Sequence, residues 1–234
     1  MQRKQRLLIV EDEVAIRTGL IDVFVYHGFD VDSAADGISG LDMARTGRYD
    51  LILLDVMMPG RNGFEVCEAI RQGDREQAII MLTAKSADDD VIQGLALGAD
   101  DYVTKPFSVA QLVLRVQAVL RRTRSSAGED SAIRIGDDIE IDTLNLCADI
   151  NNTSVKFTRR EIEVLLYLYE HCDRPVSREE LLNKVWGYAR HMGIETRTVD
   201  IHIAKLRRKI EADASEPRHL LTIRGGGYRL MSGG

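Results

Sequence analysis

Hydrophobic and polar positions follow two different patterns along the chain, and the change comes near residue 123. In the first part, short continuous apolar runs alternate with segments of helical spacing, which is typical of buried parallel strands joined by helices. The expected strands cover residues 7–10, 29–34, 51–54, 78–82 and 102–104, and the expected helices cover residues 14–28, 37–46, 63–71, 87–97 and 108–122. This order predicts an α/β fold with a doubly wound, five-stranded parallel sheet.

The second part follows a polar stretch without periodicity, residues 123–132, which is the expected linker. Residues 133–141 and 155–157 favour short antiparallel strands. Two helices open with capping boxes, Thr158-x-x-Glu161 and Ser177-x-x-Glu180. A third helix starts near Thr198, and the glycine-rich residues 221–230 predict a hairpin. Three helices and a hairpin indicate an α+β winged helix-turn-helix, so the domains are expected at residues 1–122 and 133–234.

The overall charge argues against a general nucleic-acid-binding protein, but its distribution does not. The formal net charge is −6. Within the second domain, residues 125–183 hold 6 basic and 13 acidic residues, whereas residues 184–229 hold 10 basic and 5 acidic residues. A local basic face can bind a polyanion even when the whole chain is acidic. The third helix and the hairpin are therefore the candidate DNA-binding surface.

Composition also predicts the compartment. No apolar stretch approaches the roughly 18 residues of a membrane span, and the basic residues 1–6 precede an apolar run too short for an export signal. The three cysteines, Cys67, Cys147 and Cys172, are odd in number and lack metal-like spacing. They are expected to be reduced core thiols in a cytoplasmic protein.

Reactive side chains stand where four of the expected strands end. Glu11 and Asp12 follow the first strand, Asp55 the third, Thr83 the fourth and Lys105 the fifth. Because the carboxyl ends of parallel strands share one crevice, we expect these groups in one pocket. Clustered carboxylates need a cation, and a hard divalent ion such as Mg²⁺ suits oxygen ligands. A lysine beside it is what a transferred phosphoryl group needs.

Four motifs stand in order at these strand ends: Val10-Glu-Asp-Glu13, Asp55-Val-Met-Met-Pro-Gly60, Leu82-Thr-Ala84 and Asp100-Asp-Tyr-Val-Thr-Lys-Pro-Phe107. With them, residues 1–122 resemble the flavodoxin-like receiver domain of bacterial response regulators. The resemblance implies that Asp55 is the phosphoacceptor of a histidine kinase, with its carboxylate as the nucleophile. It implies Mg²⁺ ligands at Glu11, Asp12, Asp55 and the backbone carbonyl of Met57. Glu11 stands where the family often has an aspartate.

The same resemblance assigns three further roles. Lys105 pairs with the phosphoryl oxygens, Thr83 hydrogen-bonds to one of them, and Tyr102 moves inward behind Thr83 as the switch. Taken singly, each carboxylate of the pocket is better explained as a helix N-cap or a loop charge. The full set in one order favours the phosphorylation site.

In the second domain, the third helix carries two neighbouring stripes. Its expected buried face is Val199, Ile203, Leu206 and Ile210, and the stripe one position earlier is Thr198, His202, Lys205 and Lys209. Residues 198–209 and Arg224-Gly-Gly-Gly-Tyr-Arg229 resemble the effector domain of the OmpR/PhoB type, over residues 133–230. A buried stripe beside a basic one suits a helix lying in a major groove. A simply solvated basic face is the alternative.

We expect this domain to bind promoter DNA through both the helix and the hairpin. Lys205 is expected to face away from the core and read a base edge, with Lys209 on the same stripe. Phosphate contacts are expected from Arg197, Thr198, His202 and Arg208, and Arg224 is expected in the minor groove. Trp186 is expected in the core. Two tandem half-sites are expected, and RNA polymerase is a further candidate partner.

Family members dimerise through the fourth helix, fifth strand and fifth helix, with charged pairs across the contact. Asp101 and Arg115 are retained here, but two other pairs are replaced by Val91 with Gln111 and by Ala96 with Gln117. The expected face is therefore unusually apolar; its residues are Val91, Ile92, Leu95, Asp101, Val113 and Arg115. It forms a less polar homodimer, pairs differently, or is an unused interface.

The best reading is a phosphorylation-switched transcription regulator rather than an enzyme. One alternative is an adaptor without DNA output, and the basic helix argues against it. Another is a hydrolase using Asp55 as nucleophile, which is disfavoured because Met57 stands where a general acid–base aspartate would be. A regulator of the same fold that ignores phosphate is a fourth class, and the intact pocket speaks against it.

Overall fold

The computed structural model describes residues 3–84, 97–122, 132–136, 139–188 and 196–231. The chain forms two compact units, Met1–Arg121 and Arg122–Gly234. Within the described residues, no helix is both long and apolar enough to cross a membrane. Residues 123–131 of the expected linker lie outside the described residues, and its last residue, Ala132, already begins a strand.

Unit 1 is built on a five-stranded parallel sheet in the order β2-β1-β3-β4-β5. The strands are β1 (Arg6–Val10), β2 (Asp30–Ala34), β3 (Leu51–Asp55), β4 (Ala78–Ala84) and β5 (Asp101–Lys105). The inner strands are continuous apolar runs because helices cover both of their faces. The predicted fold class is confirmed, and the predicted strand ranges differ from these by a few residues at most.

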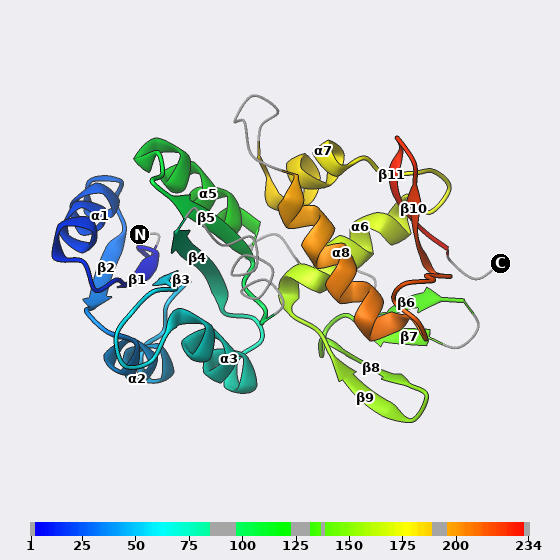
Figure 1. Ribbon diagram of the computed structural model, residues 1–234, viewed down its shortest axis with the longest axis horizontal. Coiled ribbons are helices and arrows are strands. Elements are labelled where there is room, and N and C mark those ends of the chain that lie inside the picture. Colours follow the sequence, from blue (N-terminus) through cyan, green and yellow to red (C-terminus); the bar gives the residue numbers. More distant parts are fainter. Residues whose placement is uncertain (1–2, 85–96, 123–131, 137–138, 189–195, 232–234) are drawn as a thin grey trace. The chain divides into compact units, whose positions relative to one another are not determined.

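Four described helices cover this sheet, two on each face (Figure 1). Helices α1 (Val14–Tyr26) and α5 (Val109–Arg122) pack on the face that holds the main apolar core. Helices α2 (Gly37–Thr46) and α3 (Gly63–Gly73) pack against each other on the opposite face. Helix α1 ends before Gly28, whose φ of 88° is the left-handed C′ conformation that glycine favours. The helix predicted at 87–97 lies outside the described residues except for Leu97.

Unit 2 opens with a four-stranded antiparallel sheet in the order β6-β7-β8-β9. Its strands are β6 (Ala132–Ile135), β7 (Ile139–Asp142), β8 (Cys147–Ile150) and β9 (Thr153–Lys156). The sequence pattern predicted strands at 133–141 and 155–157, and it missed β8. The missed signal is Asn151-Asn152, where φ is 52° and 60°. Two left-handed residues form the tight turn that matches the twist of a hairpin.

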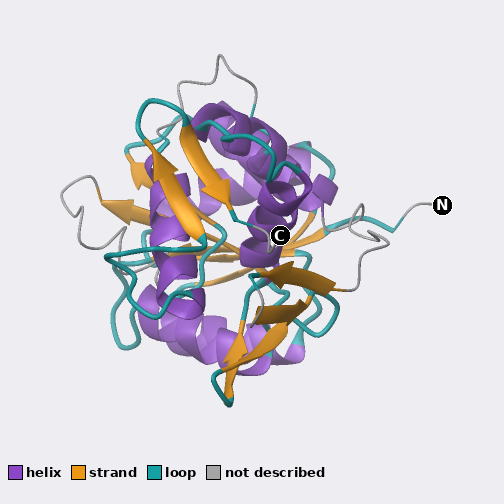
Figure 2. Ribbon diagram, turned by 90° about the vertical axis from the view of Figure 1, so that its right-hand side faces the viewer, coloured by secondary structure: helices purple, strands orange, loops and turns teal. Residues whose placement is uncertain are grey.

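The rest of unit 2 is the predicted set of helices and hairpin. Helix α6 (Arg159–Glu170) is followed by α7 (Arg178–Leu181), which continues as the π-helix η1 (Leu182–Trp186). Then come α8 (Arg197–Ile210) and the hairpin β10 (Leu220–Ile223) with β11 (Gly227–Leu230). The hairpin is a sheet of its own, separate from the four-stranded one (Figure 2). The α+β winged helix-turn-helix is therefore confirmed.

The two predicted capping boxes differ in the structure. At Thr158 both halves form, since the Thr158 side chain accepts from the Glu161 N–H and Glu161 accepts from the Thr158 N–H. At Ser177 only the first half is present: Ser177 accepts from the Glu180 N–H. The Glu180 carboxylate instead binds Arg174 and Tyr167. Helix α7 is thereby joined to α6 and to the segment that precedes it.

The buried stripe of α8 is as predicted: its four apolar residues are at most 2% exposed. Trp186, at the end of η1, is fully buried, as predicted. Its ring meets that of His202 edge-on at 5.1 Å between centroids, and the guanidinium of Arg160 lies 5.3 Å from its centroid. Trp186 is thus the point at which η1 packs between α6 and α8.

Candidate functional site

The carboxyl ends of β1 and β3 bring together the three carboxylates that the sequence pattern predicted. Ligand atoms of Glu11, Asp12 and Asp55 all lie within 4.8 Å of one another. Glu11 and Asp55 are buried, whereas Asp12 is exposed. Three clustered carboxylates with one open side fit a hard divalent cation, because oxygen ligands and an uncompensated negative charge are what such an ion requires.

Lys105 closes the pocket from β5. Its Nζ donates to Glu11 Oε2 at 2.8 Å and lies 3.1 Å from Asp55 Oδ1. The peptide bond that follows, Lys105-Pro106, is cis. The ammonium thus contacts two of the three carboxylates and leaves Asp12 to a metal ion.

The pKa shifts follow from this crowding. Burial raises the pKa of Asp55 above its ordinary value, although the charge of Lys105 pulls it down. Burial likewise raises the pKa of Glu11 against the hydrogen bond from Lys105. Burial alone would lower the pKa of Lys105, but its contacts with Glu11 and Asp55 outweigh burial and raise it. A cation in the pocket would lower the pKa of both carboxylates, since a nearby positive charge favours their ionised form.

Two other predicted residues, Thr83 on β4 and Tyr102 on β5, are buried in the structure. Thr83 is 1% exposed and Tyr102 is 8% exposed. Met57 follows Asp55 in the loop after β3, and its side chain is largely exposed. Its N–H donates to the Asp55 carboxylate. The loop is held close to β3 at Gly63, where an added Cβ would collide with the Asp55 carbonyl oxygen.

The predicted dimer face is only partly as expected. Val91, Ile92 and Leu95 lie outside the described residues. Asp101 and Arg115 pair with each other inside the chain, at 2.7 Å, and Asp101 has no exposed surface. Val113 is 5% exposed and belongs to the core. Its placement on the face was wrong, because the inward stripe of α5 includes it.

Besides Val109, Ala110 and Arg121 near its ends, the exposed residues of α5 are Gln111, Leu114 and Gln117. Leu114 is 47% exposed. The surface of the helix is therefore uncharged at these three positions, as the sequence pattern indicated for Gln111 and Gln117.

The second stripe of α8 was predicted to face solvent, and this prediction is wrong. Thr198 is 2% and His202 1% exposed. The His202 ring packs on Trp186, and its Nδ1 lies 2.9 Å from the Thr198 carbonyl oxygen. Burial lowers the pKa of His202 to about 4, which keeps the ring neutral at pH 7. These two side chains are part of the packing between α8 and η1.

The two lysines of that stripe also point inward, toward α6. Lys205 Nζ lies 2.9 Å from Glu161 Oε1, and Lys209 Nζ donates to Glu161 Oε2 at 2.6 Å. The Glu161 side chain has no exposed surface. Glu161 is the third residue of α6, where its carboxylate completes the capping box, and both lysines pair with this buried carboxylate. A glutamate among the apolar residues of a predicted helix, with two lysines four residues apart on another, was the available signal.

The outward side of α8 carries different residues. Ala204 and Arg208 are exposed, and Arg197 is half-buried at the first turn. Arg208 forms no ion pair with any residue that the structure describes. Arg224 is exposed at the tip of the hairpin, as the sequence pattern predicted.

A network of polar contacts joins α8 to the hairpin, and the sequence analysis did not predict it. Arg178 donates to Asp200 Oδ1 at 2.6 Å and to the Tyr228 hydroxyl at 2.9 Å. The Tyr228 hydroxyl donates to the same Asp200 oxygen at 2.5 Å. On the other side, Arg207 donates to the Leu220 carbonyl and to Thr222. These contacts fix the hairpin relative to α8.

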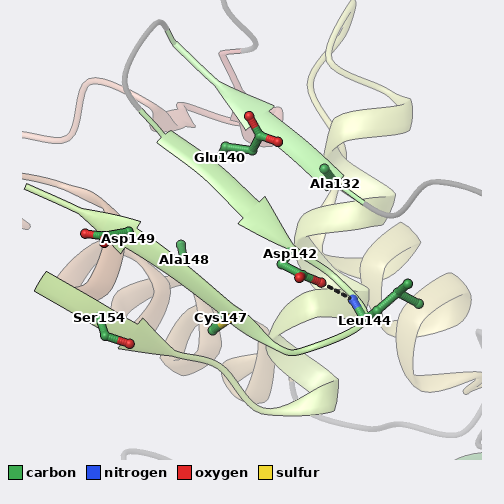
Figure 3. A pocket seen from close by; sticks show the side chains of 8 residues that line it. All are labelled: Ala132, Glu140, Asp142, Leu144, Cys147, Ala148, Asp149 and Ser154. Carbon is green, nitrogen blue, oxygen red and sulfur yellow. Dashed lines mark hydrogen bonds between the residues drawn. The ribbon is translucent and has the colours of Figure 1, made fainter. Parts of the chain in front are cut away.

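The exposed face of the four-stranded sheet carries a group of acidic side chains. A hollow there is lined by Glu140, Asp142, Cys147 and Asp149, among others (Figure 3). Asp142 is engaged in the turn, where it accepts from the Leu144 N–H. Arg134 lies opposite Glu140 and pairs with it at 3.3 Å, so this face carries both acidic and basic side chains. Of the cysteines, only Cys67 is buried; Cys147 and Cys172 are half-exposed thiols, not core residues.

Comparison with known proteins agrees with this architecture. Residues 7–117 match the model of the response regulator receiver domain, and residues 152–230 match that of the transcriptional regulatory protein C-terminal domain. The solved structure of DrrB, an OmpR/PhoB homologue from Thermotoga maritima, is 30% identical over 98% of this chain and 100% of that one, with a TM-score of 0.52.

Two further structures are similar. A mutant form of RitR is 26% identical over 98% of this chain and 100% of that one, with a TM-score of 0.75. A CheY-like receiver domain protein from Methanospirillum hungatei is 26% identical over 53% of this chain and 100% of that one, with a TM-score of 0.52.

The two matched models together cover most of the chain, and each lies within one of the two units that the structure separates. Receiver domains of this family bind Mg²⁺ at an acidic site, and the cluster of Glu11, Asp12 and Asp55 corresponds to it. The chain belongs to the two-component response regulators of the OmpR/PhoB type, which join a receiver domain to a DNA-binding domain and act on transcription.

Proposed function

We propose that Asp55 accepts a phosphoryl group from a histidine kinase and that this modification controls dimerisation and promoter binding. The observation that carries the proposal is the pocket itself. A buried carboxylate at the end of β3 lies within 4.8 Å of two others and 3.1 Å from the ammonium of Lys105. A carboxylate so placed can act as a nucleophile, provided that its charge and that of the incoming group are offset.

In the transfer, an Asp55 carboxylate oxygen forms a bond to phosphorus while the bond from phosphorus to the kinase imidazole nitrogen breaks. The electron pair of that bond stays on the imidazole. Glu11, Asp12, Asp55 and the Met57 carbonyl would hold Mg²⁺, which when bound offsets negative charge on phosphoryl oxygens. Lys105 is near enough to pair with a phosphoryl oxygen after giving up Asp55, and Thr83 would donate its hydroxyl proton to another.

Tyr102 is the proposed switch. In the register of the sheet it pairs with Met81 on β4, two residues before Thr83, and this supports the role. A movement of the Thr83 hydroxyl on β4 would affect Tyr102 on the neighbouring strand β5. The response is then a shift between two states of the β4–β5 edge rather than a new fold.

Treatment with a small phosphodonor and Mg²⁺ is expected to add one phosphoryl group to the wild-type protein. Asp55→Asn should remove the adduct, because an amide cannot act as the nucleophile, and chelation of the metal should suppress it. Intact-protein mass spectrometry measures the result. Asp12→Asn serves as a second variant, which should slow labelling without removing the acceptor. Equal labelling of the wild type and Asp55→Asn would reject the assignment.

The DNA-binding part of the proposal rests on the outward side of α8 and the tip of the hairpin. Arg197 and Arg208 are proposed to contact phosphates in and beside the major groove, and Arg224 to enter the minor groove. The contacts among Arg178, Asp200 and Tyr228 support DNA binding by α8 and the hairpin together, because they hold both in one arrangement. Two tandem half-sites are proposed for a pair of such domains.

The proposed receiver dimer is expected to depend only weakly on salt. Its face on α5 presents Gln111, Leu114 and Gln117, and screening acts only on charge. Sedimentation of the phosphorylated protein at low and high salt should give similar dissociation constants. Leu114→Asp should weaken the dimer strongly, whereas Leu144→Asp, at an exposed leucine of unit 2, is the matched control. A steep loss of the dimer with salt would mean that a charged face is used.

The main competitor is a regulator that binds DNA without phosphorylation. It predicts that Asp55→Asn leaves promoter occupancy unchanged in cells that contain the kinase. The proposed function predicts a loss of the response to the kinase in that variant, so one measurement of bound DNA separates the two.

A further inference from the structure

We propose that Glu161 limits the sequence-independent DNA affinity of the DNA-binding unit, because it holds Lys205 and Lys209 away from DNA phosphates. The inference rests on the proposed function of the unit and concerns how strongly the unit binds DNA of any sequence. Glu161 lies on α6, not on the helix that faces DNA, and its side chain has no exposed surface.

The geometry leaves little freedom for the two lysines. Lys205 Nζ is 2.9 Å from one Glu161 oxygen, and Lys209 Nζ is 2.6 Å from the other. Their side chains are only 12% and 20% exposed. Lys209 also donates to the Lys156 carbonyl at 2.8 Å and lies over the Phe157 ring. Both cations are thus paired with Glu161 inside the protein.

The buried carboxylate depends on these lysines. Burial opposes its ionisation, yet the charges of Lys205 and Lys209 outweigh burial and lower the pKa of Glu161 to about 2. If both lysines swung out to DNA, a buried charge would lose its partners, and an isolated buried charge is far less favourable than a paired one. A phosphate contact at the surface is a weaker attraction, since water and salt screen it. The lysines therefore stay with Glu161.

This arrangement reduces the sequence-independent part of DNA binding. Each cation that meets a phosphate steepens the salt dependence by about 0.9 in log K against log salt, whatever the sequence. Withholding two cations lowers affinity for all DNA and leaves readout to the outward residues of α8. The ratio of operator to non-specific affinity stays the same, because phosphate contacts contribute equally to both. Lys205, which the sequence pattern favoured as the base reader, is on this account not a DNA contact.

The test measures the salt dependence of binding of the full-length protein to a duplex of random sequence. Lys205→Met and Arg208→Met remove one cation each and keep a long side chain. Arg208→Met should flatten the slope by about one unit, and Lys205→Met should leave it unchanged. Glu161→Gln should steepen it by up to about two units, since two lysines are released. Glutamine still completes the capping box, so the start of α6 is retained.

The outcomes are distinct. If Lys205→Met flattens the slope as much as Arg208→Met does, Lys205 contacts phosphate and the inference is wrong, whereas DNA binding by the unit stands. A folded Glu161→Gln protein with an unchanged slope would also overturn it. If Glu161→Gln fails to fold, as judged by the fluorescence of Trp186, the comparison of Lys205→Met with Arg208→Met still decides. A wild-type protein that binds no DNA would instead refute the proposed function together with the inference.

Discussion

Arg71→Met is expected to destabilise unit 1 by about 3–5 kcal/mol, the range found when one partner of a buried ion pair is removed. The side chains of Arg71 and Asp100 are 6% and 7% exposed, and their charged groups are 3.1 Å apart. Arg71 also donates to the Gly98 carbonyl at 2.8 Å and to the Gln77 carbonyl at 2.6 Å. Methionine fills the space but removes the donors to these two carbonyls and the guanidinium that pairs with Asp100.

This one arginine connects α3 to the segment that leads into β5. Asp100 keeps a hydrogen bond from the Ile79 N–H at 2.8 Å, so the amide in Asp100→Asn should be tolerated better than Arg71→Met. Comparing the loss of unfolding free energy in Arg71→Met and Asp100→Asn tests whether the ion pair or the contacts to the carbonyls contribute more to stability. Since β5 ends at Lys105, loosening its start should also slow labelling of Asp55.

Hydrogen exchange of peptides from β3 and β4 measures the stability of unit 1, because core strands open only with the whole unit. Arg48→Met, at an exposed position of the same unit, is the matched control and should change little. The fluorescence of Trp186 should stay unchanged in both variants. A loss below about 1 kcal/mol in Arg71→Met would mean that the pair contributes no more than a surface ion pair does.

The sequence was enough to predict unit 1 because several signals agree there. Apolar runs at β1, β3 and β4 are continuous and are buried on both faces, so their periodicity is unambiguous. The rule that parallel strands share one carboxyl edge then placed Glu11, Asp55 and Lys105 together. The sequence could not predict how α5 packs on the sheet. The Asp101–Arg115 contact and the burial of Val113 both depend on how α5 is rotated against the sheet.

Unit 2 was predicted less well, for a physical reason. Helix α8 is packed on more than one side, so apolar spacing located one buried stripe and gave no sign that the neighbouring polar stripe is also covered. Polar residues are buried only where partners exist, and the partners, Glu161 and Trp186, come from α6 and η1. A partner distant in sequence is not encoded in the spacing of α8 itself. The sheet strand β8 was missed because its residues alternate weakly.

Unit 2 is expected to lose stability as the pH falls from about 6.5 to 4, through the burial of His202. The pKa of its imidazole is lowered from 6.5 to about 4, chiefly by burial. Between these values the unfolded chain binds a proton that the folded unit does not, so protons favour unfolding. The difference corresponds to about 3 kcal/mol once the pH reaches the folded pKa. Lys205 and Arg160 add to the lowering, while Glu161 and the Thr198 carbonyl oppose it.

Glu161 extends the effect to lower pH. Its folded pKa is about 2 against an ordinary value of 4.5, so the stability that it provides is present above pH 4.5 and is lost as the pH falls toward 2. The two groups act in the same direction in successive windows, His202 first and Glu161 second. Acid should therefore unfold unit 2 progressively, without a stable plateau between about pH 6 and 3.

Urea unfolding followed by the fluorescence of Trp186 measures this directly, because Trp186 is the single tryptophan of the chain and lies 5.1 Å from the His202 ring. The free energy of unfolding at pH 7.5, 6.0 and 5.0 should fall steadily in the wild type. His202→Gln should start lower, since it disturbs the packing on Trp186, but should lose much less between pH 7.5 and 5.0. His219→Gln, at a partly exposed histidine of the same unit, controls for the removal of a histidine. Parallel pH profiles for the wild type and His202→Gln would show that the buried imidazole is not the group responsible.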